Sequence, residues 1–236
     1  MYEHTVRAFD ADLQELAQKI AAMGLLAKRQ MADAIDALAN CNITLAKSVV
    51  TVDDQIDALQ REIEEKAVVT LARRQPMAVD LREIIGDLRI SNDLERIGDL
   101  AENIAIEAAT LADEFRPNAV MLQLDRMMKL VIDQLSRVLD SYAQRDAAEA
   151  LAVWRRDVEV NAMNSSLFRE LLTYMLENPR NIAFCLHMSF CAKNIERMGD
   201  HAANIAETVY FIAEGRALPD ERPKAGIGPG NLPSPA

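Results

Sequence analysis

The chain has 236 residues and a formal net charge of −11, and half of its residues are hydrophobic although only 5% are aromatic. This length allows one large domain or two compact ones with real cores, and the composition favours an all-helical protein. The negative charge argues against non-specific nucleic-acid binding and against docking on an anionic membrane, although a solvated acidic surface would produce the same value.

The first half of the chain predicts three long amphipathic helices, because apolar residues recur every three or four positions. These helices span about 13–38, 49–71 and 78–111. A polar turn at 40–42 separates the first two, and Pro76 and Pro117 end the second and third, since proline disfavours helix in the residue before it.

The second half repeats this pattern. Its three predicted helices span about 124–142, 151–175 and 182–212. Polar residues at 144–148 form a turn, Pro179 ends the second helix and Gly215 closes the third. From 219 onward proline and glycine dominate without any period, which predicts a disordered tail.

One motif occurs in both halves, on the third predicted helix of each. Residues 95–105 read ERIGDLAENIA and residues 196–206 read ERMGDHAANIA, so eight of eleven positions are identical. Residues 53–59 similarly resemble 157–163 on the second helix of each half. The sequence therefore predicts an all-α fold of six long antiparallel helices, forming two tandem three-helix bundles related by internal duplication. The predicted domains are 1–114 and 115–216, followed by the tail at 217–236.

The repeated motif predicts a row of oxygen ligands on each helix. At 100° per residue, side chains spaced by four fall on one stripe, opposite the apolar side of the helix. These stripes consist of Glu95, Asp99 and Asn103, and of Glu196, Asp200 and Asn204. A stripe of this kind can also be an ordinary solvent-facing surface, with Arg96 and Asp99 forming a simple i,i+3 ion pair.

Two features favour a functional site over a plain solvent face. The same short side chains recur at the same offsets in both copies, and Gly98 and Gly199 lie in mid-helix, where glycine costs about 1 kcal/mol relative to alanine. We therefore expect another helix to approach each glycine closely. Carboxylate and amide oxygens suit hard or borderline cations such as magnesium, manganese or iron. Further ligands are expected from neighbouring helices, namely Asp53, Asp57, Asp157 and Asn161.

No catalytic motif accompanies these stripes. Residues 1, 184 and 198 precede the three histidines by three positions and none is glutamate, so the Glu-x-x-His pairs of oxygen-activating di-iron bundles are missing. His201 adjoins Asp200 but is rotated away from it on the helix, which disfavours it as a ligand. The chain also lacks a phosphate-binding glycine loop and a Gly-x-Ser-x-Gly motif. We therefore expect a protein that is not an enzyme.

The sequence favours a cytoplasmic location. Its three cysteines are widely spaced and form neither a disulfide framework nor a zinc-ligand pattern. The first thirteen residues lack the apolar core of a signal peptide, and the longest stretch of low charge, about 182–192, is shorter than the roughly 20 residues needed to span a bilayer.

The duplicated motif resembles the PhoU family, the regulatory accessory proteins of the phosphate-specific transport system. The segment from Pro76 to Arg82 and the Asp157 segment are also similar to this family, and the resemblance covers about 5–215. It implies two three-helix bundles, a homodimer, and clusters of iron or zinc at Glu95, Asp99, Glu196 and Asp200. It further implies a negative regulator that couples the ATPase of the phosphate ABC transporter to a sensor histidine kinase. A metal-handling or metal-storage protein is the alternative.

Overall fold

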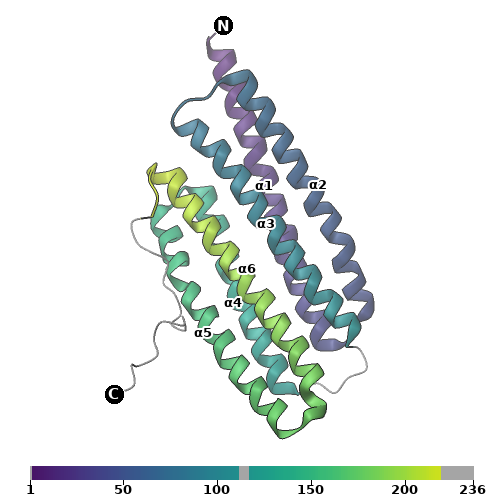
Figure 1. The fold of residues 1–236 in the computed structure, drawn as a ribbon. Helices are drawn as coiled ribbons and strands as arrows, with labels where there is room; N and C mark the ends of the chain where they lie inside the picture. Colours follow the sequence, from purple (N-terminus) through teal and green to yellow (C-terminus); the bar gives the residue numbers. More distant parts are fainter. Residues whose placement is uncertain (1, 112–116, 219–236) are drawn as a thin grey trace, which may run out of the picture.

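A computed structural model describes residues 2–111 and 117–218, and within these ranges it contains helices and no strand (Figure 1). The helices are α1 Tyr2–Asn40, α2 Ile43–Arg74, α3 Val79–Thr110, α4 Asn118–Gln144, α5 Ala147–Glu177 and α6 Ile182–Glu214, with a short 3-10 turn at Pro179–Asn181. The predicted all-α fold with six long helices is thus confirmed. The predicted disordered tail lies outside the described residues apart from its first two positions.

Polar caps and a glycine end the helices at the turns predicted from the sequence. The Asn42 side chain accepts a hydrogen bond from the Leu45 backbone N–H (3.0 Å), which caps the start of α2. Asp146 caps α5 by accepting from the backbone N–H groups of Ala148 (2.9 Å) and Glu149 (3.1 Å). Gly215 ends α6 with a φ of +73°, a left-handed conformation that glycine adopts without steric cost.

The six helices form two three-helix bundles that lie side by side (Figure 1). Helices α1, α2 and α3 contact one another, as do α4, α5 and α6. The two bundles meet through α3 against α6 and α1 against α4, while α2 and α5 contact only helices of their own bundle. Both motif-bearing helices therefore lie at the centre of the molecule, and each has an outer helix beside it.

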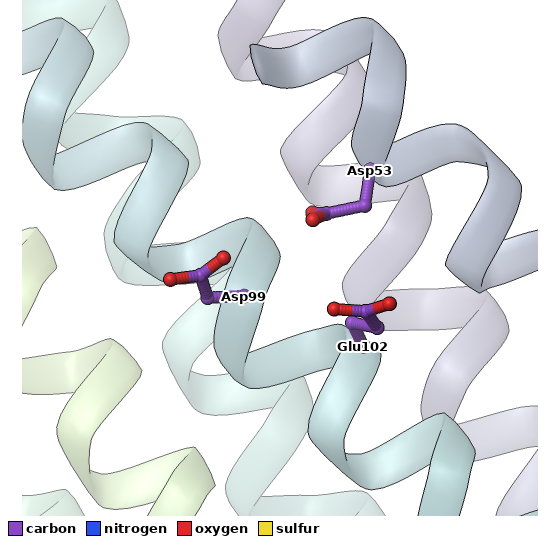
Figure 2. A group of neighbouring side chains, drawn as sticks. All are labelled: Asp53, Asp99 and Glu102. Atoms are coloured by element: carbon purple, nitrogen blue, oxygen red, sulfur yellow. The ribbon is translucent and has the colours of Figure 1, made fainter.

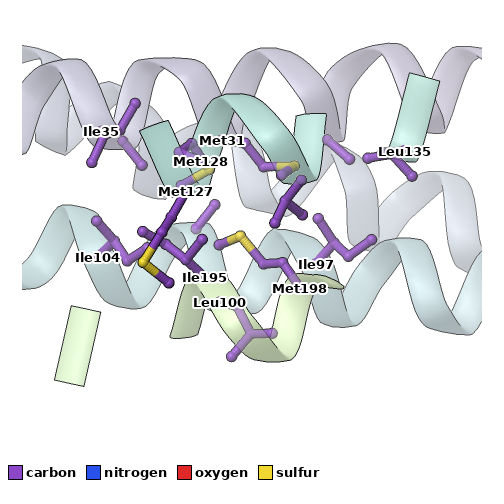
Figure 3. Close-up of a cluster of buried hydrophobic side chains, with 14 of the residues drawn as sticks. Met31, Ile35, Ile97, Leu100, Ile104, Met127, Met128, Leu135, Ile195 and Met198 are labelled. Carbon is purple, nitrogen blue, oxygen red and sulfur yellow. The ribbon is translucent and has the colours of Figure 1, made fainter. Parts of the chain in front are cut away.

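The apolar core is continuous across both bundles. Figure 3 shows side chains from four helices packed into one cluster. Its labelled members are Met31, Ile35, Ile97, Leu100, Ile104, Met127, Met128, Leu135, Ile195 and Met198. Separate domains at 1–114 and 115–216 remain a prediction, and residue 114 itself lies outside the described residues. No helix in the described part is long and apolar enough to cross a bilayer.

Polar pairs also join the two bundles along α3. His201 Nδ1 lies 2.8 Å from Asp93 Oδ1, and His187 Nδ1 lies 2.5 Å from Glu107 Oε2. Tyr142 Oη donates to Asp87 Oδ1 at 2.5 Å, and Asp87 is only 1% exposed. Removing this carboxyl from water raises its pKa to about 7, although the hydrogen bond from Tyr142 opposes the shift.

Candidate metal centre

Three carboxylates from two helices of the first bundle converge on one point (Figure 2). Asp53 extends from α2, and Asp99 and Glu102 extend from α3. One oxygen atom of each lies within 4.8 Å of the others, and all three side chains are half-buried. Among the described residues, this is the only group of three or more His, Cys, Asp or Glu side chains that meets this distance criterion.

A glycine and a buried amide position this cluster. A Cβ atom placed on Gly98 would lie 2.8 Å from Asp53 Oδ1 and 3.1 Å from Ile56 Cδ1, so α2 packs closely on α3 because this residue has no side chain. Gln30 on α1 is buried and donates to Asp53 Oδ1 (3.0 Å) and to the Val49 carbonyl (3.3 Å). The close helix approach predicted at Gly98 is therefore confirmed.

Two carboxylates of the cluster, Asp53 and Glu102, and the neighbouring Glu95 have raised pKa values. Burial raises the pKa of Asp53, and the nearby Asp99 and Asp57 raise it further, against the opposing hydrogen bond from Gln30. Burial likewise raises the pKa of Glu95 and of Glu102, with Asp99 and Asp53 among the charges that add to both shifts. A bound cation would relieve this repulsion, so the site is electrostatically suited to one.

The donor set fits a hard or borderline cation. Carboxylate oxygens coordinate such ions at roughly 2.0–2.6 Å, so oxygens separated by up to 4.8 Å can share one ion. Asp99 Oδ2 also accepts from Arg96 Nη1 at 2.9 Å, the i,i+3 pair anticipated from the sequence. This pair is largely exposed and leaves the other oxygen of Asp99 available for an ion.

The first bundle brings only some of the predicted ligands together. Asp53 and Asp99 are within the cluster. Glu95 lies close enough for Asp99 to shift its pKa, and its Oε2 is 3.3 Å from Arg96 Nε. Asp57 is half-buried on α2 and raises the pKa values of its acidic neighbours, and Asn103 is half-buried on α3. Glu95 and Asp57 thus lie near the cluster, whereas Asn103 is one helical turn beyond Asp99, and all three stay predicted ligands outside the converging group.

Sequence reasoning missed two members of this site. Glu102 belongs to the first copy of the motif but is replaced by Ala203 in the second, so the comparison of copies gave it no weight. Its position three residues after Asp99 was the available signal, because such residues share one helix face. Gln30 carried no signal, since only packing shows that its amide reaches Asp53.

The equivalent position in the second bundle is arranged differently. Asp157 is 3% exposed and accepts from Asn161 Nδ2 at 2.9 Å, while Glu196 forms an ion pair with Lys193. Asn204 turns toward the first bundle, where its Nδ2 donates to Asp93 Oδ1 at 3.3 Å. Asp200 is half-buried beside these groups on α6. The second predicted metal site is therefore not assembled as the first one is.

The glycines show the same difference between the bundles. A Cβ atom on Gly199 would lie 3.5 Å from Asp157 Oδ1 and 3.6 Å from Val160, which are ordinary contact distances. The tight approach predicted for both copies is thus found at Gly98 and not at Gly199. Helix α5 leaves room for a side chain where α2 does not.

This duplicated three-helix fold, with an acidic motif on the third helix of each bundle, defines the class of PhoU-domain proteins. The family model described as "PhoU domain" matches residues 20–108 and 124–209. The chain therefore belongs to the PhoU family. It is 49% identical over 223 residues to the "Phosphate-specific transport system accessory protein PhoU homolog" of Rhizobium meliloti (strain 1021), covering 94% of each protein. Its identity to the homolog of the same description in Caulobacter vibrioides (strain NA1000 / CB15N) is 46%, over 96% of this chain and 99% of the relative.

Solved structures show the same fold. The crystal structure of PhoU from Pseudomonas aeruginosa superimposes with a TM-score of 0.85 at 39% identity, covering 88% of this chain and all of that one. The phosphate transport system regulatory protein PhoU from Streptococcus pneumoniae gives a TM-score of 0.83 at 27% identity, covering 89% and 99% of the two chains. These structures confirm the predicted family and fold class.

Proposed function

We propose that this chain is a non-enzymatic regulator of phosphate uptake. In this role it restrains the phosphate ABC transporter through its ATPase subunit, and it keeps the phosphate-starvation response off through a sensor histidine kinase. The observation that carries the proposal is near-full-length similarity, at 49% identity, to a protein described as a phosphate-specific transport system accessory protein. The rigid double bundle without a catalytic motif suits a protein that acts by binding.

Gene deletion tests this role. Cells without the gene should express phosphate-starvation genes at high external phosphate, and the wild-type gene should restore repression. Unchanged repression in the deletion strain would overturn the proposal. A direct test is isothermal titration of the purified chain with the transporter's ATPase subunit, and separately with the cytoplasmic part of the kinase.

We propose further that Asp53, Asp99 and Glu102 hold a metal ion between α2 and α3. Iron, zinc, manganese and magnesium all accept carboxylate oxygens, so this donor set does not choose among them. Bound there, the cation neutralises carboxylates whose charge is disfavoured by burial and links two helices of one bundle. The second row, Glu196, Asp200, Asn204, Asp157 and Asn161, remains a proposed site of lower ligand density.

The same cluster also supports the alternative of a metal-handling protein without a signalling role. The two functions separate in a strain whose only copy carries Asp53→Asn, Asp99→Asn and Glu102→Gln. If metal storage is the function, this strain loses metal tolerance and keeps phosphate-dependent repression. If regulation is the function, metal tolerance stays normal in this strain. Phosphate-dependent repression is then the only property for which the cell needs the wild-type gene.

We also propose that the chain works in the cytoplasm as a homodimer. Its negative charge and its free cysteines fit that compartment, and buried Cys185 and Cys191 are protected within the core. Light scattering of the purified chain, coupled to gel filtration, measures the mass directly. A monomer at micromolar concentration would exclude the dimer.

A further inference from the structure

The outer face of the second bundle carries exposed apolar side chains on two neighbouring helices. On α5 they recur every four residues, as they do on α6, so each set lies along one side of its helix. The exposed fractions are 48% for Phe168, 41% for Leu172, 86% for Leu176, 42% for Ile182, 57% for Leu186 and 47% for Phe190. We call these six residues the α5–α6 strip. Exposed apolar side chains aligned in this way on neighbouring helices indicate a candidate interaction surface.

A cationic hollow continues the strip. It lies between α5 and α6, has a volume of about 490 Å³, and is lined by Asn164, Ser165, Phe168, Arg169, Ser189 and Lys193. Two side chains of this lining are cations and none is a carboxylate. In a chain with a net charge of −11, this is a local reversal of charge beside exposed apolar surface.

Internal duplication does not account for this surface. In the first bundle, the positions equivalent to Phe168 and Arg169 are Glu64 and Glu65. Phe190 corresponds to Arg89, and Lys193 corresponds to Asn92. Apolar exposure recurs there at Val68 and Leu81, but the residues equivalent to Arg169 and Lys193 carry no positive charge. The first bundle therefore does not repeat the pairing of these apolar side chains with these two cations.

From this combination we propose that the α5–α6 face docks an acidic amphipathic helix of a partner protein. The apolar stripe of such a helix lies along the groove between α5 and α6, which is a common mode of peptide recognition. Its carboxylates meet Arg169 and Lys193, and the polar groups of Ser165 and Ser189 supply hydrogen bonds. Lys193 forms an ion pair with Glu196. A carboxylate of the partner helix would replace Glu196 in this ion pair.

Charge decides between this occupant and two others. A second copy docking on this face by a two-fold axis would bring both sets of cations into one interface, and the lining of the hollow supplies no carboxylate to pair with them. An anionic membrane is repelled by the net charge of −11, which acts against the local attraction of two cations. An acidic amphipathic helix complements both features, because its apolar side chains pack on the α5–α6 strip and its carboxylates pair with the cations of the hollow. The proposal does not depend on phosphate regulation, because it uses only the shape and charge of this face.

Two synthetic peptides test the proposal against the full-length chain. Both are 18-residue amphipathic helices with the same leucine stripe, one with glutamate and the other with lysine on its polar face, and binding is followed by fluorescence anisotropy. We expect the acidic peptide to bind and the basic one to bind at least tenfold more weakly. Arg169→Glu with Lys193→Glu should reverse that order, and Leu172→Gln with Leu186→Gln should weaken the acidic peptide at least tenfold.

A matched control is available in the first bundle. Val68 occupies the position equivalent to Leu172 and is 62% exposed, so Val68→Gln should leave binding unchanged. Circular dichroism confirms that the variants, all at exposed positions, remain folded. Equal binding of both peptides, or binding that the charge reversal leaves unaltered, overturns the proposal. The proposal is also overturned if neither peptide binds and the chain binds phosphatidylglycerol vesicles, which would indicate a membrane. It is likewise overturned if neither peptide binds and Leu172→Gln with Leu186→Gln disrupts a dimer, which would indicate a second copy.

Discussion

The two bundles carry nearly the same motif but use it differently. In the first, Gly98 brings α2 against α3, and Asp53, Asp99 and Glu102 converge within 4.8 Å. In the second, Ala203 replaces Glu102, and the contacts around Gly199 are of ordinary length. The repeated residues therefore preserve the helix and its packing face, while one non-repeated carboxylate completes the acidic cluster of the first bundle.

Matched positions also differ at the contact between the two bundles. Asp87 and Tyr142 form a buried hydrogen bond there, and each has an equivalent in the opposite bundle, Met188 for Asp87 and Leu38 for Tyr142. All four side chains are largely buried, so these matched positions are polar in one case and apolar in the other. Such a difference at matched positions lets each feature be tested against its own internal control.

The largest expected effect concerns metal binding. Glu102→Ala removes one of three converging ligands, so we expect metal affinity to fall at least tenfold, because each carboxylate both coordinates the cation and offsets its charge. Glu196→Ala should leave that affinity within about twofold, since Glu196 belongs to the other bundle and pairs with Lys193. Metal content of the purified variants is measured by elemental analysis after dialysis against each metal.

The same experiment checks the unequal roles of the two bundles. If Glu196→Ala loses as much metal as Glu102→Ala, both bundles contribute equally to metal binding, which would contradict the difference between them. Circular dichroism shows whether either variant changes the helix content. Protons compete with the cation because the pKa values of Asp53, Glu95 and Glu102 are raised, so binding should weaken as the pH falls.

The sequence predicted the fold well because helix boundaries are local. Apolar spacing defines each helix, and Pro76, Pro179 and Gly215 lie at ends that the structure confirms. The site was predicted less completely, because its members depend on which helices pack together. Asn204, predicted as a metal ligand, also donates a hydrogen bond to Asp93 across the contact between the bundles, and the sequence does not indicate this bond. No sequence pattern within α6 indicates that α3 packs against the side of α6 that carries Asn204.

The next effect concerns the buried carboxyl at the contact between bundles. Its folded-state pKa of about 7 lies well above the ordinary value of an aspartate, so the native state binds the proton more tightly than the unfolded chain. Asp87 therefore stabilises the fold least when it is ionised, and stability falls as the pH rises between about 4 and 7. Asp87→Asn keeps an acceptor for Tyr142 and removes the charge. We expect it to raise the free energy of unfolding by about 1–3 kcal/mol at pH 8 and to change it little at pH 5.

Urea unfolding at the two pH values measures this difference. Asp140 is exposed on α4, and Asp140→Asn serves as a control for the simple loss of one negative charge. A gain at pH 8 that matches that of the control, or one that persists at pH 5, would show that the buried carboxyl is not responsible. The equivalents of Asp87 and Tyr142, which are Met188 and Leu38, are apolar and buried, so these positions of the fold do not require a charge.

The two motif glycines are expected to respond to alanine in opposite directions. Gly199→Ala fits at ordinary contact distance and gains helix propensity, so it should stabilise the chain by about 0.5–1 kcal/mol. Gly98→Ala gains the same propensity but forces Asp53, Gln30 and Ile56 to move, so it should destabilise by about 1 kcal/mol. It should also weaken metal binding, because the Gln30–Asp53 hydrogen bond is disturbed. Stabilisation by both alanines would show that α2 and α5 approach their glycines alike.

The smallest expected effect concerns the contact between the second and third helix of each bundle, which different side chains occupy in the two bundles. In the second bundle, Trp154 is 2% exposed and donates from Nε1 to Glu207 Oε1 at 2.8 Å. The equivalent residues are Val50 and Ile106, which are exposed beside a hollow of about 270 Å³. Glu207→Ala should destabilise by about 0.5–1 kcal/mol, because water replaces the exposed carboxylate as acceptor only in part. Glu207→Gln keeps an acceptor oxygen and should lose less. Equal losses in the two variants would mean that the charge of Glu207, rather than its hydrogen bond to the indole, stabilises this crossing.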